Sequence, residues 1–359
     1  MTAHVLAIVQ LPPPVTGLSA VNERMVEELS RVGKLAAVAD VASPNGATGL
    51  RKHLGRLVRI LSAAGLLIRS RAQGATTVYM PSDGRAGMVG NIALILVARA
   101  MRYRIWVHHH NFSYLNRWSL LMWLQLSLAP CAVVHLALCP DMLERLKVRY
   151  AGPWRRRRHV GRTLSNAFMA APGPPAAVRS GPLVIGHLSN LMVSKGAIRF
   201  IELFAAARDL GLPIRAEMAG PIWDEDVRDA VEAAEAQYPE SFRWHGPLYG
   251  PAKAQFYAGI DAFVLPTDYL NEAQPVVLLE ALSAGAAVLA TARGCIPYDF
   301  ANAPGLIAPL ASFDHAALAW LAEYANGEGR AELQRAAEAT FSRMHAESEA
   351  SLAETLDAL

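Results

Sequence analysis

One segment, residues 263–291, restricts the possible folds more than any other part of this 359-residue chain. It begins with an apolar run, Phe263–Leu265, that ends at Pro266, as expected of a strand buried inside a parallel sheet. A polar loop follows, then residues 276–282 form a helical stretch that is apolar on nearly every side. A second apolar run comes after Gly285. This order predicts a strand, a buried helix and another strand of an α/β protein.

Two acidic side chains in this segment are candidate functional groups. Glu280 lies within the apolar helix, and a buried carboxylate is costly unless it is paired or hydrogen-bonded. Glu272 follows the first strand, at the carboxyl edge where open α/β sheets bind their ligands. We therefore expect Glu280 to have a polar partner and Glu272 to face a ligand.

The charge of the chain is divided between its two halves. Residues 1–170 contain 22 Lys and Arg against 7 Asp and Glu, whereas the remainder contains 12 against 24. A basic half indicates a surface that faces phosphate groups, of a membrane or of a nucleic acid.

Composition also indicates a compartment. The three cysteines, Cys131, Cys139 and Cys295, show no CxxC spacing, which favours a reducing compartment and argues against a zinc site. The apolar run near the N-terminus is too short for a signal peptide, so we expect a cytoplasmic protein.

The pattern of strands and helices predicts two domains. Apolar runs alternate with amphipathic helices before and after a segment rich in Ala, Pro and Gly, residues 170–182, which we interpret as a linker. We expect an N-terminal domain at 1–172, a C-terminal domain at 180–340, and a last helix at 341–359.

Two loops are candidate phosphate sites. Residues 12–17 join a first strand to a helix at 19–30, and Gly17 lets a ligand approach the helix N-terminus, where anions are favoured. Lys195 and Gly196 similarly precede a helix at 197–210, so a cation lies beside free backbone donors. An ordinary strand–helix turn and a surface lysine are the alternatives.

Residues 51–71 predict a basic amphipathic helix, since Leu54, Leu57, Val58 and Leu61 share one face. The residues opposite them are Lys52, Arg56 and Arg59. Such a helix can lie on an anionic membrane surface, although a domain helix with a solvated basic face fits equally. No aromatic residues interleave with the basic ones, and no nucleic-acid motif is present, so we expect no nucleic-acid partner.

The uncharged stretch 118–139 is long enough to raise the question of a membrane span. Gln125, Pro130 and His135 argue against a span. A buried helix ending at Leu128 and a strand at 132–138 are expected instead.

Neither the histidines nor the acidic pairs predict a metal site. His108, His109 and His110 follow one another on a strand, where side chains alternate between faces and cannot converge on one ion. A proton-handling or substrate-binding role suits His109 or His110 better, because both lie near the strand end. Asp224 and Asp226 open a helical segment, where carboxylates are favoured without a ligand.

The residues 271–291, NEAQPVVLLEALSAGAAVLAT, resemble the motif of family 4 glycosyltransferases of the GT-B fold, in which seven residues separate two glutamates. The loop GHLSNLMVSKG at 186–196, Gly17, and the strand ends at Gly220, Gly246 and Pro266 support the resemblance, which covers nearly the whole chain. It implies two Rossmann-like domains facing each other across a cleft, with the last helix crossing back to the N-terminal domain. The implied reaction is metal-independent transfer of a sugar with retained anomeric configuration, with no cofactor beyond the nucleotide sugar.

The resemblance also implies roles for individual residues. Lys195 would neutralise the donor diphosphate, Glu280 would bind the ribose, and Glu272 would contact sugar hydroxyls. His110 or His109 would lie near the transferred sugar. The remaining residues implied for the donor site are Gly17, His187, Asn190, Gly220, Ala273, Gln274, Pro275 and Val276, with backbone N–H groups at 273–276 steadying the sugar and phosphate.

The chain departs from the family pattern at several positions. His187 stands where the family often has arginine, and Asn190 or Arg199 would have to compensate. Other replaced family residues are at Ala20, Ala273, Cys295 and Tyr298.

We therefore predict a retaining glycosyltransferase at the inner face of the cell membrane, acting on a glycan or lipid-linked acceptor in cell-surface polysaccharide or glycolipid synthesis. The alternative is a non-catalytic nucleotide-sugar-binding GT-B protein. A nicotinamide enzyme is disfavoured because no GxGxxG follows the first strand. The sequence leaves the oligomeric state unknown.

Overall fold

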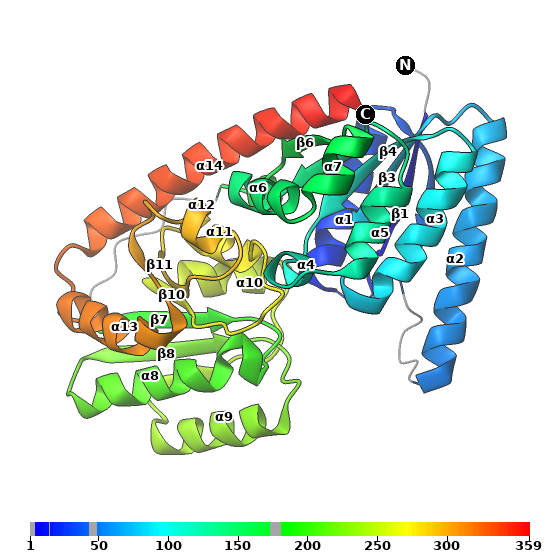
Figure 1. The fold of residues 1–359 in the computed structure, drawn as a ribbon. Coiled ribbons are helices and arrows are strands. Elements are labelled where there is room, and N and C mark those ends of the chain that lie inside the picture. Colours follow the sequence, from blue (N-terminus) through cyan, green and yellow to red (C-terminus); the bar gives the residue numbers. More distant parts are fainter. Residues whose placement is uncertain (1–3, 14, 43–48, 173–180) are drawn as a thin grey trace. The chain divides into compact units, whose positions relative to one another are not determined.

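The computed structural model describes residues 4–13, 15–42, 49–172 and 181–359. They form two compact units, each built on a parallel sheet of six strands (Figure 1). The N-terminal unit contains residues 1–169 and 348–359, and the C-terminal unit contains residues 170–347. Most of the expected linker, residues 173–180, lies outside the described residues.

The N-terminal unit has the strand order β2-β1-β3-β4-β5-β6. Its strands form because apolar residues run continuously through them, as in β1, of which every residue is buried. Its strands are β1 (Val5–Val9), β2 (Leu35–Asp40), β3 (Thr77–Ser82), β4 (Arg104–His109), β5 (Val134–Ala137) and β6 (Val160–Thr163). Its helices are α1 (Gly17–Arg31), α2 (Gly49–Ala72), η1 (Arg85–Gly87), α3 (Met88–Ala100), α4 (Ser113–Asn116), α5 (Leu120–Leu128), α6 (Pro140–Arg149), α7 (Ala151–Arg157) and η2 (Asn166–Met169).

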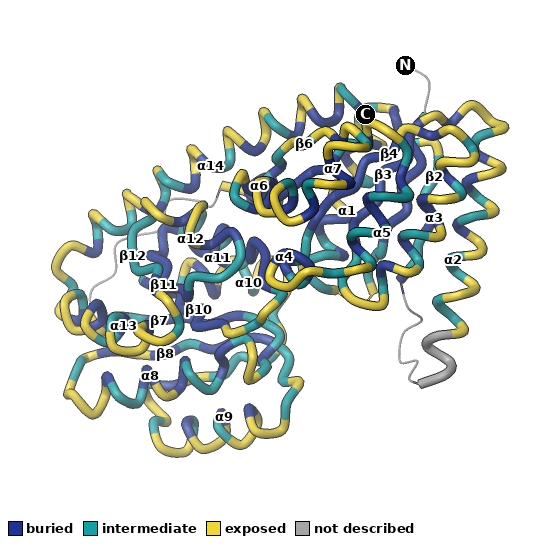
Figure 2. The backbone as a smooth tube through the Cα atoms, viewed as in Figure 1, coloured by how far each residue is buried: buried dark blue, intermediate teal, exposed yellow. Residues whose placement is uncertain are grey.

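The C-terminal unit has the strand order β12-β11-β10-β7-β8-β9. Figure 2 shows the buried strands of each unit beneath helices whose outer sides are exposed. Its strands are β7 (Leu183–Leu188), β8 (Ile214–Ala219), β9 (Phe242–Trp244), β10 (Ala262–Leu265), β11 (Ala287–Thr291) and β12 (Gly305–Ala308). Its helices are η3 (Val193–Lys195), α8 (Ala197–Asp209), α9 (Glu225–Gln237), α10 (Gly250–Ala258), α11 (Val276–Ser283), α12 (Ile296–Asp299), α13 (Leu310–Tyr324) and α14 (Arg330–Ala358).

The segment 263–291 forms the expected strand, helix and strand as β10, α11 and β11. β10 and β11 pair directly, with Phe263 opposite Val288, and β10 also pairs with β7. The carboxyl ends of β7 and β10 are therefore adjacent at one edge of the sheet. The loops that carry Lys195 and Glu272 leave from these two ends.

Helix α2 differs from the expectation in the direction of its charged side chains. Arg56 binds Asp83 at 2.5 Å and Arg59 binds Asp40 at 2.5 Å, so both arginines reach back to carboxylates at strand ends of the sheet and are 33% and 36% exposed. The apolar face that carries Leu54 points outward instead. The expected solvated basic face is therefore wrong for these two arginines. The side chain of Lys52 lies outside the described residues.

The uncharged stretch 118–139 forms α5 and β5, as expected. Among the described residues, no helix is both long enough and apolar enough to cross a bilayer. The four consecutive arginines after Trp154 begin within α7, a short helix that the charge run concealed.

The last helix, α14, contributes its final turns to the N-terminal unit. The ammonium group of Lys34 is buried and donates hydrogen bonds to the carbonyls of Leu356 and Asp357, at 2.7 and 2.8 Å. Ser348 accepts a hydrogen bond from the backbone of Phe168 and donates one to the carbonyl of Ser165. These contacts make residues 348–359 part of the N-terminal core.

Candidate active site

Lys195 and Glu272 form the centre of a charged site in the C-terminal unit. The Nζ of Lys195 lies 2.6 Å from Oε2 of Glu272, whose side chain is almost fully buried. The same carboxylate oxygen accepts a hydrogen bond from the hydroxyl of Thr267 at 3.3 Å. The Lys195 ammonium also lies 4.7 Å from the centre of the Tyr269 ring, a cation–π distance. Residues that are 77 positions apart thus meet at one edge of the sheet.

Gly196 explains how the two loops come so close. Its backbone is in the left-handed region, with φ +83°, and a Cβ at this position would lie 2.3 Å from the carbonyl oxygen of Pro266. Only glycine permits both the conformation and the contact. The loop after β7 is therefore pressed against the loop after β10, which places Lys195 beside Glu272.

The segment between Glu272 and α11 is held by the loop after β11. A Cβ on Gly294 would lie 2.3 Å from the Glu272 carbonyl and 2.5 Å from the Ala273 carbonyl. The N–H of Cys295 donates to the carbonyl of Ala273 at 2.8 Å, and the side-chain amide of Gln274 donates to Asp299 at 2.6 Å. The loop after β11 therefore holds the backbone at 272–274 in place.

This fixed segment leads into the N-terminus of α11. Pro275 precedes the helix in an extended conformation, and no side chain caps the first turn. In the part of the chain that the structure describes, the N–H groups of Val276 and Val277 have no hydrogen-bond partner. Free donors at a helix start favour an anion. The donors expected at this position are thus available.

Glu280 has partners, but it is less buried than the sequence indicated. Its side chain is 22% exposed, because it points from α11 towards α10 rather than into the core. Lys253 donates to one carboxylate oxygen at 2.6 Å and the Tyr257 hydroxyl to the other at 2.9 Å. Burial raises the pKa of Tyr257, and the carboxylate of Glu280 raises it further, so the phenol stays a donor.

Lys253 and Tyr257 were not singled out from the sequence. They lie four residues apart on α10, so they share one face of that helix. That spacing was the available signal, but the pairing of α10 with α11 could not be read from it.

His187 is a structural residue in this conformation rather than an exposed donor ligand. It lies inside β7, not in the loop where the sequence placed it, and it is fully buried. Its Nδ1 is 2.8 Å from the carbonyl of Val264, and its Nε2 is 3.0 Å from the Ser189 hydroxyl. Burial lowers its pKa to about 4, so the ring is neutral at pH 7. Arg199, one suggested compensating residue, is paired with Asp314.

Gly220 ends β8 in a conformation that requires glycine. Its φ is +124°, and a Cβ would lie 1.8 Å from the carbonyl oxygen of Ser189. Ser189 donates its hydroxyl hydrogen bond to the carbonyl of Asn190, which is half-buried. Gly220 therefore shapes the loop that carries Asn190.

The candidate histidines of the N-terminal unit lie on different faces of the sheet. His108 and His110 lie on one face of the sheet, with ring centres 3.9 Å apart, and His109 points to the other face. The alternation expected of a strand is confirmed, so the three rings do not share one face of the sheet.

His109 is part of a buried hydrogen-bonded cluster. One ring nitrogen lies 2.8 Å from the Tyr114 hydroxyl and the other 2.9 Å from Nδ1 of His135. Burial lowers the pKa of His109 to about 3. In contrast, Nε2 of His110 has no hydrogen-bond partner among the described residues. His110 is therefore the better candidate for a ligand contact.

Gly17 begins α1, and nothing lies within 4 Å of the position of its missing Cβ. The side chains of Thr16 and Ser19 form a capping box that satisfies the N–H of Ser19. Pro14, in the same loop, lies outside the described residues.

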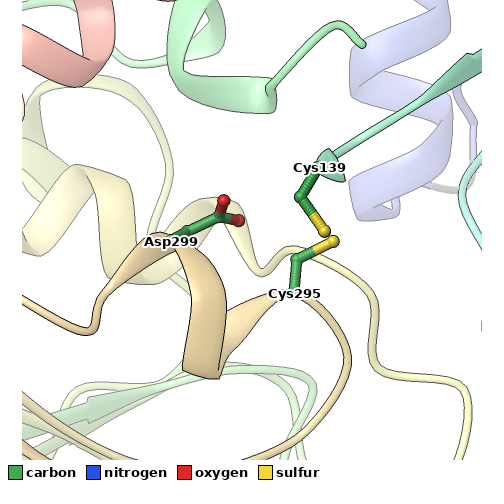
Figure 3. A group of neighbouring side chains, drawn as sticks. All are labelled: Cys139, Cys295 and Asp299. Atoms are coloured by element: carbon green, nitrogen blue, oxygen red, sulfur yellow. The ribbon is translucent and has the colours of Figure 1, made fainter. Parts of the chain in front are cut away.

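Three further potential metal ligands are drawn in Figure 3. Cys295 and Asp299 lie at the two ends of α12 in the C-terminal unit, where Asp299 accepts the hydrogen bond from Gln274. Cys139 caps α6 in the N-terminal unit, accepting from the N–H of Met142 at 3.4 Å. Cys139 and Asp299 therefore each accept a hydrogen bond within their own unit. Asp224, of the acidic Asp-x-Asp pair, accepts a hydrogen bond from the N–H of Val193.

Part of the chain matches a known protein family. Residues 175–339 match the family model described as glycosyl transferases group 1. No curated protein sequence matches the chain.

Three solved structures match over nearly their whole length. HepE (Alr3699) of Anabaena, solved in complex with UDP, has 15% identity and a TM-score of 0.67, and the match covers 99% of this chain and 100% of HepE. A glycosyltransferase of Rickettsia africae has 13% identity and a TM-score of 0.66, with 99% and 97% covered. The lipopolysaccharide outer core galactosyltransferase WaaB has 14% identity and a TM-score of 0.67, with 98% of each chain covered. The expected GT-B fold is thereby confirmed.

Proposed function

We propose that this protein is a retaining glycosyltransferase that uses a nucleotide-sugar donor. The observation that carries the proposal is the pair of Lys195 and Glu272, assembled beside the free N–H groups at the start of α11. The pair lies within the segment that matches glycosyl transferases group 1. A cation, an acceptor of hydroxyl hydrogen bonds and helix-start donors are the three groups that a sugar diphosphate requires.

In this mechanism the bond between the anomeric carbon and the diphosphate oxygen breaks, and the leaving diphosphate keeps the electron pair. Lys195 stabilises the charge that develops on the diphosphate, together with the N–H groups of Val276 and Val277. The acceptor hydroxyl forms the new bond on the same face of the sugar and gives its proton to the departing diphosphate oxygen. His187 is neutral, so Lys195 has to supply the cationic charge without help from that position.

The other donor contacts follow from the same arrangement. Glu272 accepts hydrogen bonds from sugar hydroxyls, and Glu280 accepts them from the ribose while Lys253 and Tyr257 hold it in place. His110, whose Nε2 has no hydrogen-bond partner among the described residues, is the histidine that we assign to the transferred sugar. We propose no metal in the reaction, because Lys195 and the helix donors supply the positive charge that a divalent ion otherwise provides.

The proposed acceptor is a glycan or a lipid-linked glycan, in cell-surface polysaccharide or glycolipid synthesis at the inner face of the cell membrane. The complex of HepE with UDP-glucose makes uridine nucleotides the first donors to examine. A screen of nucleotide sugars by calorimetric binding, followed by mass spectrometry of products, tests the donor and the transfer. The coupling constant of the anomeric proton in the product tests retention, and unchanged turnover in EDTA tests metal independence.

Substitution of the central pair is the sharpest test. In Lys195→Ala and Glu272→Ala, transfer should fall by about 10²–10³-fold, the usual effect of losing one electrostatic stabiliser. Arg228→Ala, which removes an exposed cation from α9, should leave transfer unchanged and serves as the control. Wild-type turnover in both variants, with circular dichroism showing a folded protein, would reject the assigned roles.

One observation favours a second candidate, a GT-B protein that binds nucleotide sugars without transferring them. His187 is buried and neutral where the resemblance implies an arginine, so one permanent charge is missing. Donor-dependent binding without transfer or hydrolysis, across the same screen, would support this candidate.

A further inference from the structure

Helix α2 presents a stripe of large apolar side chains to solvent. The exposed fractions of these residues lie between 51% and 65%, and their spacing of three or four residues, and multiples of it, puts them on one face. We call this face the α2 stripe, and it consists of Leu54, Leu57, Val58, Leu61 and Ile68. From Leu54 to Ile68 the stripe is about 21 Å long at the rise of an α-helix.

The opposite face of α2 already holds the helix on its unit. Ala63 and Leu67 are buried in the core between α2 and the sheet. Arg56 and Arg59 pair with carboxylates at the ends of β3 and β2. The orientation of α2 is thus fixed by packing and by two ion pairs, so the stripe cannot turn inward without breaking them. Figure 2 shows exposed positions along this helix.

The neighbouring helix also carries exposed apolar side chains. A Cβ on Gly90 of α3 would lie 2.7 Å from Cδ1 of Ile60, so α2 and α3 pack closely side by side (Figure 1). On α3, Val89 and Leu96 are exposed by 57% and 42%. An exposed apolar area of this kind usually marks an interaction site.

The charge around the stripe indicates the chemistry of its partner. Residues 41–140 contain eleven Lys and Arg but a single carboxylate, Asp83, which is neutralised by Arg56. Arg69, exposed and next to Ile68, and Arg85, exposed just before α3, carry positive charge beside the apolar surface. A partner that is apolar at depth and anionic at its surface satisfies both features, and an anionic lipid bilayer has this structure.

We propose that the α2 stripe inserts into the headgroup region of an anionic membrane, with the exposed arginines binding lipid phosphates. A second copy of the chain fits less well, because a symmetric contact brings the same basic surface against itself. The proposal goes beyond the transfer reaction, since this surface acts whatever the C-terminal unit binds.

The test uses the full-length protein and vesicles of phosphatidylglycerol and phosphatidylcholine. Wild-type protein should sediment with mixed vesicles and much less with pure phosphatidylcholine. Leu57→Gln/Leu61→Gln should lower partitioning at least about tenfold, since both side chains leave the membrane interior. Val148→Gln/Val160→Gln is the matched control, because both valines are exposed in the same unit but lie outside the stripe. It should bind as the wild type does.

A spectroscopic measurement separates insertion from surface adsorption. In Leu61→Trp, the added tryptophan should shift to shorter wavelength with anionic vesicles and be quenched by brominated lipid chains. Arg69→Gln should weaken binding about threefold at low salt and little at high salt, because exposed charges are screened.

Three results would overturn the proposal: unchanged binding by the double glutamine variant, equal binding to neutral vesicles, or a dimer that the same variant dissociates. Binding to nucleic acid in place of vesicles would also overturn it. Nucleotide-sugar binding by the C-terminal unit is measured in the same variants. Retained donor binding with lost membrane binding keeps the two proposals distinguishable.

Discussion

The candidate functional side chains of the two units differ in their charge. In the N-terminal unit, His108, His109 and His135 lie in the interior as neutral rings bound to tyrosines or to each other. In the C-terminal unit the polar groups of the candidate site are charged side chains in pairs, Lys195 with Glu272 and Lys253 with Glu280.

This difference predicts different sensitivities. A neutral buried network is stable only while it remains unprotonated, whereas a paired charge can exchange its partner for an anionic ligand. The overall charge follows the same division: 22 Lys and Arg against 10 Asp and Glu in the N-terminal unit, and 12 against 21 in the C-terminal unit.

The largest effect is expected from acid, which should unfold the N-terminal unit before the C-terminal unit. Burial lowers the pKa of His109 and of His110 to about 3, and it also lowers the pKa of His108, His135 and His159. The unfolded chain therefore binds more protons below pH 6.5, so stability is complete above that pH and falls as the pH drops. Each deeply buried ring contributes up to about 1.4 kcal/mol per pH unit.

Hydrogen exchange with peptide-resolved mass spectrometry at pH 7.5 and pH 5 measures this effect in each unit separately. The C-terminal unit supplies the internal control, because among its described residues His187 is the one fully buried histidine, and a single ring gives a smaller loss than several. Equal loss of protection in both units would contradict the interpretation.

A glycine substitution at the end of β8 should lower the stability of the C-terminal unit. Gly220→Ala should cost about 1–3 kcal/mol of stability, because it combines a positive φ with a clash against the Ser189 carbonyl. Gly246→Ala is the matched control, since its φ is also positive, at +69°, but nothing lies within 4 Å of its added Cβ.

Urea unfolding followed by circular dichroism gives both free energies. The expected order is wild type, then Gly246→Ala, then Gly220→Ala. Variants of equal stability would mean that conformation alone, and not the close approach, requires glycine at the end of β8.

The smallest effect is expected for Tyr257→Phe. This change removes one of the two donors to Glu280 without altering the ring, and a single hydrogen bond to a charged group contributes about 1.5–3 kcal/mol at most. Because Lys253 still holds the carboxylate, we expect only a few-fold loss of nucleotide-sugar affinity. Calorimetric titration measures it, and Tyr249→Phe, an exposed position before α10, is the control. An affinity equal to that of the wild type would show that Glu280 does not contribute to donor binding.

The sequence predicted most of the fold because its central strands are short apolar runs and its helices have a clear period. Three strands were missed: β2, β6 and β12. Each has half-exposed positions and lies at one edge of its sheet. An edge strand mixes apolar and exposed residues, so it lacks the signal of a buried one.

The candidate site could be predicted less completely. Glu272 and Lys195 were found because each follows a recognisable strand and loop. Lys253, Tyr257 and Thr267 were missed, because their contacts depend on how α10 and the β10 loop pack. His187 was placed in a loop because the strand was expected to end at Ile185. Three more residues of β7 carry it into the sheet interior.

The buried ammonium of Lys34 has a consequence for the order in which the protein can fold. Its hydrogen-bond partners are the carbonyls of Leu356 and Asp357, which the ribosome adds more than 320 residues later, after the whole C-terminal unit. Until then the emerging N-terminal unit holds a cation without those two carbonyls and a core without Leu352 and Leu356. The unit that is synthesised first therefore completes its folding last.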